Sequence, residues 1–348
     1  MMCVIDMRSD AASMPTPEMI QAITTARLGD SISREDPTVR QIEELGAEMF
    51  GKEDAVFVIS GTMANQVAVA TLTRRGQEVI VGLESHIYNL EVAGMAAVSQ
   101  VQARPISCPQ GFMDPAELEA AINEPGVQVA DTGLICLENT YNLNRGYIMS
   151  LENIRTISKI ATAKGIPVYM DGARIFNAAV ASGVDVKEIV SSVDAVQVCL
   201  TKGLGAPIGS LLIGDAAFTA EARKIQQRLG GGMRQAGIIA APGIVALNKM
   251  VDRLSEDHEN ARYLACCLHE LDNRLLSLED VQTNIVSIDI GFTGIDSNTF
   301  LSLLNHRNIF IKRIGPSAFR LVCYHNINRP MIDKVIDALD DILSQEGA

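Results

Sequence analysis

Lys202 follows an apolar segment, Val196–Leu200, that has the composition of a buried strand. Gly203 and Gly205 come shortly after it and give the backbone unusual freedom. A lysine at such a strand end can be desolvated, lose its proton and act as an amine nucleophile toward a carbonyl. A second predicted strand upstream ends at Asp171. A pyridoxal phosphate site needs an amine for the cofactor aldehyde and a carboxylate for the ring nitrogen, so this pair predicts a site for that cofactor.

Ser60, Gly61 and Thr62 stand between a predicted strand and a predicted helix. Glycine lets the backbone approach an anion closely, and the N–H groups of the first helical turn point toward it. The three residues are therefore candidates for binding the cofactor phosphate. On their own they are more typical of an ordinary capped turn. Because Lys202 and Asp171 occur in the same chain, we favour the functional interpretation.

His86 and Arg174 are the next candidates. His86 follows the predicted strand Glu78–Val81 at the same sheet edge, where it could lie over the cofactor ring or act as an acid–base group. A single histidine is more often structural. Arg174 comes three residues after Asp171 and could clamp a substrate carboxylate, or it could be only the ion-pair partner of Asp171.

Short apolar segments alternate with amphipathic ones between about residues 50 and 215. This alternation predicts an α/β fold with a mostly parallel sheet, helices on both faces and active residues at the carboxyl ends of strands. The last two strands are close enough to form a hairpin around Lys202. The predicted strands are Ala55–Ile59, Glu78–Val81, Gly133–Leu137, Val168–Met170, Ala195–Leu200 and Gly209–Ile213. The predicted helices are Thr62–Thr73, His86–Val98 and Leu151–Ala163.

A different pattern begins after the three glycines at 230–232. Long helices alternate there with short strands, which indicates a smaller α+β unit. We therefore predict a large cofactor-binding domain over residues 1–243 and a small domain over residues 244–348. The predicted helices are Ile238–Arg253, Asn260–Leu276 and Pro330–Leu343, and the predicted strands are Ile285–Ile290, Ile309–Lys312 and Arg320–Cys323.

The overall composition excludes several classes of function. The 348 residues carry a net charge of −13, which argues against nucleic acid or an anionic membrane as the main partner. The seven cysteines, Cys3 among them, show neither CxxC pairs nor Cys/His ligand spacing, so we expect no metal and a reducing, cytoplasmic location. No segment approaches the roughly 20 apolar residues of a membrane span, and charges near the amino terminus oppose a signal peptide. A small-molecule substrate is therefore expected.

Several longer motifs occur together and in order. With them the chain resembles the threonine aldolase or β-eliminating lyase family of pyridoxal phosphate enzymes, over nearly its whole length. The resemblance implies fold type I, in which a mostly parallel sheet carries helices on both faces and a smaller α+β domain follows. The motifs that carry it are Asp6–Asp10, Glu35–Thr38, Ser60–Gln66, Asp171–Asn177, Lys202–Pro207 and Leu229–Gly237.

The resemblance also implies roles for residues that match the family pattern around the cofactor. Lys202 matches the lysine that bonds to the cofactor aldehyde. Asp171 matches the partner of the pyridine nitrogen, and His86 matches the histidine stacked on the ring. Gly61 and Thr62 match the phosphate cup, with Ser60 beside them.

Further matching residues imply a substrate clamp and an assembly. Ser9, Arg174 and Arg320 match the groups that hold the substrate carboxylate, and Arg174 also borders the cofactor. Arg234 lies in a segment that, in the family, reaches the site of a neighbouring subunit and its cofactor. Family members are usually tetramers built as pairs of dimers. The resemblance therefore implies a homotetramer with active sites at subunit interfaces.

Two segments depart from the family pattern, at three positions in all. The family typically has histidine, near the substrate β-hydroxyl, where this chain has Tyr141. It typically has tyrosine and glycine where this chain has Ser33 and Arg34. Because a phenol is a weaker base than imidazole near neutral pH, Tyr141 could mark a changed reaction. Alternatively, His86 or water takes the proton in an ordinary aldolase.

Three hypotheses for the function follow. The leading one is a threonine aldolase-type lyase that splits a β-hydroxy-α-amino acid into glycine and an aldehyde. The alternative is a racemase or β-eliminating lyase that removes the Cα proton, suggested by the departures at Tyr141 and Ser33. For racemisation, Lys202 and Tyr141 could supply acid–base groups on the two faces of the ring. The third is a scaffold without catalysis, which the retention of Lys202 and Asp171 opposes.

Overall fold

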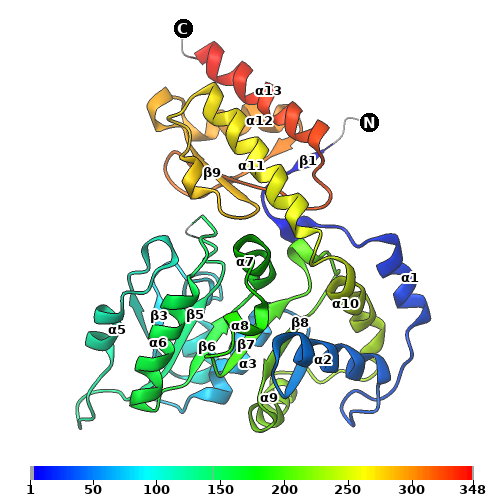
Figure 1. Ribbon diagram of the computed structural model, residues 1–348, viewed down its shortest axis with the longest axis vertical. Coiled ribbons are helices and arrows are strands. Elements are labelled where there is room, and N and C mark those ends of the chain that lie inside the picture. Colours follow the sequence, from blue (N-terminus) through cyan, green and yellow to red (C-terminus); the bar gives the residue numbers. More distant parts are fainter. Residues whose placement is uncertain (1–3, 144, 347–348) are drawn as a thin grey trace.

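The computed structural model describes residues 4–143 and 145–346, which form a larger and a smaller body (Figure 1). The larger body is built on a seven-stranded sheet with the order β2-β8-β7-β6-β5-β3-β4. Its pairs are parallel except those of β8, which runs antiparallel to β2 and β7. The strands are β2 (Asp54–Val58), β3 (Glu78–Gly82), β4 (Gln102–Ile106), β5 (Thr132–Glu138), β6 (Val168–Asp171), β7 (Ala195–Cys199) and β8 (Ser210–Gly214).

Helices cover both faces of this sheet. Successive residues of each strand point to opposite faces, so each strand contributes apolar side chains to both layers of helices. Val56 and Val58 of β2 pack in one apolar cluster with α3 and α9, whereas Ala55 and Phe57 pack in another with α2. Burial on both faces explains the nearly continuous apolar sequence of the strands. On the first face lie α3 (Gly61–Leu72) and α9 (Ala216–Arg228). The second cluster includes residues of α1 (Pro17–Thr25), α2 (Pro37–Phe50), α5 (Pro115–Ala121), α6 (Leu151–Lys164), α7 (Ile175–Ser182), α8 (Val186–Ile189) and α10 (Gly237–Lys249).

The smaller body has its own apolar core beneath an antiparallel sheet of order β11-β12-β9. Ile5 and Met7 belong to this core, and the amino-terminal strand pairs with a strand near residue 310. The core of the larger body extends to Leu254. The division between residues 243 and 244 stays a prediction. The elements are β1 (Ile5–Asp6), α11 (Leu254–Leu271), β9 (Ile285–Asp289), α12 (Ser297–His306), β10 (Ile309–Phe310), β11 (Lys312–Arg313), β12 (Ala318–Val322) and α13 (Arg329–Glu346).

The predicted α/β architecture is confirmed, but two predicted elements are wrong. The helix predicted over His86–Val98 ends at once as α4 (His86–Asn89). Val92 and Ala93 have left-handed backbone conformations, with φ of 54° and 55°, which a right-handed helix cannot contain. A π-helical turn over Met95–Ser99 follows. The strand predicted over Ile309–Lys312 is divided between β10 and β11, which belong to different sheets.

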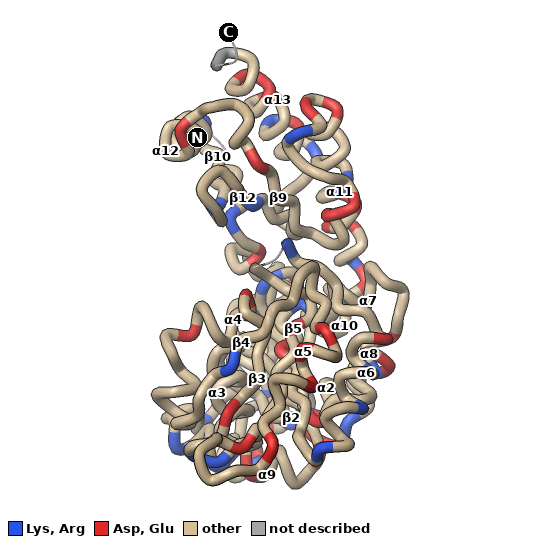
Figure 2. The backbone as a smooth tube through the Cα atoms, turned by 90° about the vertical axis from the view of Figure 1, so that its left-hand side faces the viewer, with Lys and Arg blue, Asp and Glu red and all other residues tan. Residues whose placement is uncertain are grey.

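Acidic residues are spread over the whole molecule. Figure 2 shows them along α11 and α13 of the smaller body and at α2 and α9 of the larger one. Among the described residues, no helix is both long and apolar enough to cross a membrane. The described cysteines are all unpaired, and Cys3 lies outside the described residues.

Candidate active site

A cavity of about 240 Å³ lies at the carboxyl ends of β5, β6 and β7. These strands are parallel neighbours, so their carboxyl ends meet at one edge of the sheet. The cavity brings together seven of the predicted site residues, which are Ser60, Gly61, Thr62, His86, Asp171, Arg174 and Lys202. Six further polar residues also line it, which are Asn65, Glu138, Thr140, Asn142, Gln197 and Thr201.

Lys202 reaches the cavity from a strained turn between β7 and β8. The two strands form the predicted hairpin, with Cys199 opposite Ser210. Lys202 has a φ of 60°, a left-handed conformation that costs an L-residue roughly 1–2 kcal/mol. The Ser13 hydroxyl donates to the Lys202 carbonyl at 2.6 Å and holds the turn. No residue in the described part of the chain hydrogen-bonds the Lys202 amine, so this amine is available to a ligand.

Asp171 is a buried carboxylate that three donors hold in one orientation. It accepts hydrogen bonds from Asn65 Nδ2 at 2.8 Å, from the Gln197 side-chain amide, and from the Ala173 backbone N–H at 3.0 Å. A fixed, buried carboxylate can stabilise a positive charge on a heterocyclic nitrogen. The position of Asp171 therefore fits a pyridine ring bound in the cavity.

His86 stands at the start of α4 and lines the cavity, with 29% of its side chain exposed. Its Nδ1 lies 2.9 Å from Oε1 of the buried Glu91. The hydrogen bond to Glu91 raises the pKa of His86, and the charge on Asp171 acts in the same direction, whereas burial and Lys202 oppose them. None of the described residues bonds to Nε2, so this nitrogen is the one open to a ligand.

The amino terminus of α3 forms another wall of the cavity. Ser60 caps the helix by accepting from the Met63 backbone N–H at 3.1 Å. Position 61 has room only for glycine, because a Cβ there would lie 2.8 Å from Cys199 Sγ. The free N–H groups and positive dipole end of a helix attract an anion, so this wall fits a phosphate group.

Arg174 and Arg320 form a buried pair of guanidinium groups. Arg174 donates to both oxygens of Asp10, from Nε at 2.8 Å and Nη2 at 2.6 Å, and to Asn142 Oδ1 at 2.9 Å. Arg320 Nη1 donates to the same Asn142 oxygen at 3.0 Å. Burial and the positive charge of Arg174 lower the pKa of Arg320 to about 10. One carboxylate for two guanidinium groups leaves positive charge that a substrate carboxylate could balance.

Glu138 is a buried carboxyl group in the cavity wall that no sequence argument singled out. It accepts the backbone N–H of His86 at 2.6 Å and that of Asn142 at 2.8 Å. Burial raises the pKa of Glu138 to about 7, and the charge on Asp171 acts in the same direction. A carboxyl group that titrates near neutral pH can hold or release a proton during a reaction.

Sequence reasoning also missed Asp10, Asn142 and Glu91. Asp10 and Asn142 lie in segments that carried the family resemblance or its departures, so a signal was present. Their roles depend on contacts between distant residues, such as the 164 positions between Asp10 and Arg174. Glu91 lay inside the segment that was wrongly predicted as a helix.

Comparison with known proteins decides the family. The model of the family described as Beta-eliminating lyase matches residues 6–290. This chain belongs to the beta-eliminating lyase family. The probable low-specificity L-threonine aldolase 2 of Arabidopsis thaliana is 41% identical over 343 residues, which cover 97% of each chain. The low specificity L-threonine aldolase of Escherichia coli K12 is 35% identical over 333 residues, covering 95% of this chain and 97% of that one.

Solved structures agree with this assignment. A threonine aldolase from Leishmania major superposes with a TM-score of 0.84 at 18% identity, covering 97% of this chain and 99% of that one. The predicted resemblance to threonine aldolases and the predicted fold type I architecture are therefore confirmed. The prediction of an enzyme of the pyridoxal phosphate-dependent aldehyde-lyase type is confirmed as well.

Tyr141, one of the departures from the family pattern, does not reach the cavity. Its side chain is 1% exposed, and its hydroxyl accepts the Glu84 backbone N–H at 2.9 Å. Thr140 and Asn142 line the cavity, and Tyr141, between them, points to the other side. Burial raises the pKa of the phenol far above its ordinary value. This geometry does not support the predicted catalytic role of Tyr141, nor the racemase alternative that used its phenol. The β-eliminating alternative did not depend on this phenol and stays a prediction.

Ser33, Arg234 and Ser9 lie outside the cavity lining of this single chain. Ser33 is exposed, with its hydroxyl 3.5 Å from an Asp30 oxygen. Arg234 pairs with the same Asp30 at 2.8 Å. The Ser9 hydroxyl accepts the Ala11 backbone N–H at 3.2 Å, beside the carboxylate that holds Arg174. Their predicted contacts with substrate or with the site of a neighbouring subunit stay predictions.

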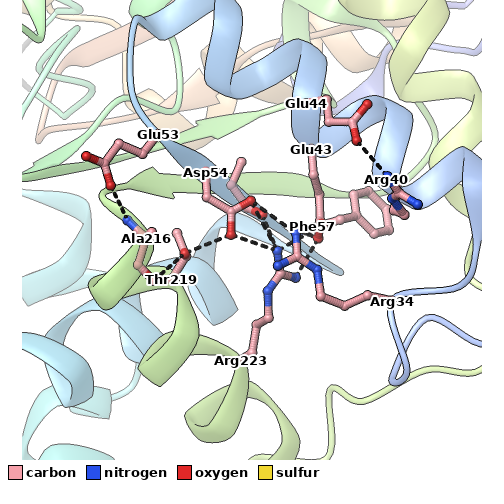
Figure 3. Close-up of polar contacts among 11 residues, drawn as sticks. Arg34, Arg40, Glu43, Glu44, Glu53, Asp54, Phe57, Ala216, Thr219 and Arg223 are labelled. Atoms are coloured by element: carbon pink, nitrogen blue, oxygen red, sulfur yellow. Dashed lines mark hydrogen bonds and ion pairs between the residues drawn. The ribbon is translucent and has the colours of Figure 1, made fainter.

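Arg34, the remaining departure, ties its loop to the larger body. Its φ is 58°, which a glycine would adopt without strain. Its guanidinium lies 3.3 Å from Asp54 Oδ1 and 4.0 Å from Glu43 Oε2 (Figure 3). Arg223 of α9 contacts the same two carboxylates at 3.3 Å and 2.8 Å. These ion pairs explain why arginine is accommodated where the family typically has glycine.

Proposed function

We propose that this enzyme cleaves β-hydroxy-α-amino acids, threonine and allo-threonine among them, into glycine and an aldehyde. The observation that carries the proposal is one cavity lined by the Lys202 amine, the Asp171 carboxylate and the Arg174 guanidinium, with Arg320 joined to it through Asn142. The names of the relatives that match nearly the whole chain support the same reaction.

We propose pyridoxal 5'-phosphate as the cofactor. Lys202 would anchor it covalently, Asp171 would pair with its ring nitrogen, His86 would lie against its ring, and the residues from Ser60 to Thr62 would bind its phosphate. The lack of space at Gly61 supports this fit, because a Cβ there would lie 2.8 Å from Cys199 Sγ and would displace the amino terminus of α3 from the cavity. When bound, the cofactor supplies an aldehyde that bonds to amines and a ring that withdraws electrons from Cα.

The residues of the chain then divide the remaining work. Arg320, whose buried Nε has no partner in the described part of the chain, binds the substrate carboxylate together with Arg174. His86 accepts the β-hydroxyl proton at Nε2. The Cα–Cβ bond breaks as this proton leaves, the β-carbon departs as an aldehyde, and Cα takes up a proton to give glycine. Glu138 holds the backbone of His86 and of Asn142 in place for this step.

Aldehyde detection with threonine, allo-threonine and phenylserine tests the reaction. We expect aldehyde and glycine in equal amounts from at least one of these substrates. The absence of turnover with all of them would contradict the proposal. The cofactor is tested separately by visible absorbance, which should disappear on borohydride reduction and be absent from Lys202→Ala.

We further propose a cytoplasmic homotetramer with sites near subunit interfaces. The unpaired cysteines support a reducing location. The exposed Arg234, which pairs with Asp30, is available to a neighbouring subunit and its cofactor. Light scattering of the purified enzyme tests the assembly, and a monomer at the concentrations used in the activity assay would overturn it.

A further inference from the structure

Glu91 is a buried carboxylate that contacts the histidine of the cavity. Its Oε1 lies 2.9 Å from His86 Nδ1 and accepts Asn65 Nδ2 at 2.6 Å. Its Oε2 accepts Gln66 Nε2 at 2.6 Å. Asn65 Nδ2 also donates to Asp171 Oδ2 at 2.8 Å. One amide therefore bridges the carboxylates of Glu91 and Asp171, and His86 is bonded to the first of them.

The backbone beside Glu91 is strained in a way that apolar packing does not explain. Val92 and Ala93 both adopt left-handed conformations, which a β-branched residue rarely does. Val92 is 93% exposed, so its side chain gains no burial in return. At Gly94 a Cβ would lie 2.6 Å from the Gln66 side chain. Strain of this kind is typical of a segment held for function, and here it accompanies the contact between the Glu91 carboxylate and His86.

We propose that Glu91 is a positioning residue for His86. By holding Nδ1, its carboxylate fixes the orientation of the imidazole and leaves Nε2 as the nitrogen that exchanges protons in the cavity. The inference rests on the proposed function, since His86 needs a basic Nε2 only if it takes a proton from the substrate. The Asn65 side-chain amide links Glu91 to Asp171 by donating to both carboxylates.

The charges around His86 agree with this role. The hydrogen bond to Glu91 raises the pKa of His86, and the charge on Asp171 raises it further. Burial and the positive charge of Lys202 act in the opposite direction. Glu138 contacts the His86 backbone N–H rather than the ring. Within the described residues, Glu91 is thus the charged group that touches an imidazole nitrogen of His86.

The test is an NMR titration of the histidines in the holoenzyme, labelled at the imidazole carbons. The chain has five histidines, and the signal of His86 is identified by its absence from His86→Asn. We expect the pKa of His86 to fall in Glu91→Gln, because the amide keeps the shape but loses the charge. Glu91→Asp should keep part of the effect. An unchanged His86 titration in Glu91→Gln overturns the proposal.

Glu84→Gln is the matched control, because Glu84 carries the same charge two residues before His86 but contacts Tyr141 instead. It should leave the His86 titration unchanged. In the activity assay, the acid limb of kcat/KM should move to lower pH in Glu91→Gln and stay in place in Glu84→Gln. A lack of aldehyde release by the unmodified enzyme refutes the reaction, whereas an unmoved titration in an active aldolase refutes the positioning role.

Discussion

Asp10→Asn should be among the most destabilising conservative changes in this enzyme. Asp10 is fully buried, and both of its carboxylate oxygens accept hydrogen bonds from Arg174 at 2.8 Å and 2.6 Å. Asn284 Nδ2 adds a contact at 3.3 Å. The substitution keeps the volume but removes the charge. Arg174 then stays buried beside Arg320, and no other described residue offers it a bonded negative partner.

The expected loss is about 3–5 kcal/mol of unfolding free energy, which is typical when one partner of a buried ion pair is removed. The pKa of Asp10 gives a second estimate of the stabilisation. Although burial opposes ionisation, Arg174 lowers the pKa of Asp10 from 3.8 to about 2, which corresponds to about 2 kcal/mol. Since the folded pKa is the lower one, this stabilisation is present above about pH 4. It is lost as the pH falls through about 2.

Asp6→Asn is the matched control. Asp6 also binds an arginine through two oxygens, since Arg8 donates to it at 2.9 Å and 2.6 Å. The Arg8 side chain is 58% exposed, however, and exposed pairs contribute only about 0–1 kcal/mol. Urea unfolding at pH 7 measures both variants. Equal losses for Asp10→Asn and Asp6→Asn would refute the reasoning from burial. The difference between the wild type and Asp10→Asn should also shrink below about pH 4.

Tyr141→Phe should lower the free energy of unfolding by about 1 kcal/mol, because the hydrogen bond to Glu84 is lost, and should leave kcat for threonine within about twofold. Steady-state kinetics measures kcat, and a large fall would show that the Tyr141 hydroxyl takes part in the reaction. Gly61→Ala should weaken cofactor binding at least about tenfold, because the added Cβ would lie too close to Cys199 Sγ. Titration of the apoenzyme with the cofactor measures the affinity, and an unchanged value would contradict the assignment of this helix end to the phosphate. Arg34→Gly should change the free energy of unfolding by no more than about 1 kcal/mol, because the relief of backbone strain at a φ of 58° offsets the loss of half-exposed ion pairs. A larger loss of stability in urea unfolding would show that the ion pairs dominate.

The sequence predicted six of the seven strands of the central sheet, all but β4, and the residues at the ends of these strands. Lys202 and Asp171 follow apolar runs that are buried on both faces, so the end of each run marks a cavity position. The helix amino terminus at Gly61 was recognisable for the same reason, since a glycine follows an apolar strand there. Local patterns of this kind need no knowledge of distant contacts.

The parts that could not be predicted depend on distant pairing or on strained backbone. Arg174 was correctly placed at the cavity, but the ion-pair partner suggested for it, Asp171, was wrong. Its partner is Asp10, to which nothing local in the sequence links it. Glu91 was hidden because its segment has helical periodicity, and the left-handed conformations of Val92 and Ala93 cannot be inferred from composition. Tyr141 was predicted from its position in a motif, which does not say to which side of the backbone a side chain points.

The departure at Tyr141 is accommodated by packing rather than by new chemistry in the cavity. Gly82 provides the space for the phenol, because a Cβ there would lie 3.0 Å from Tyr141 Cε2. A racemase needs a second acid–base group across from Lys202, and the phenol that the sequence offered for this role lies in the core. Aldol cleavage needs only a base for the β-hydroxyl, and His86, bonded to Glu91, can supply it. We therefore expect the departure at Tyr141 to leave aldol cleavage as the reaction, with His86 as the base.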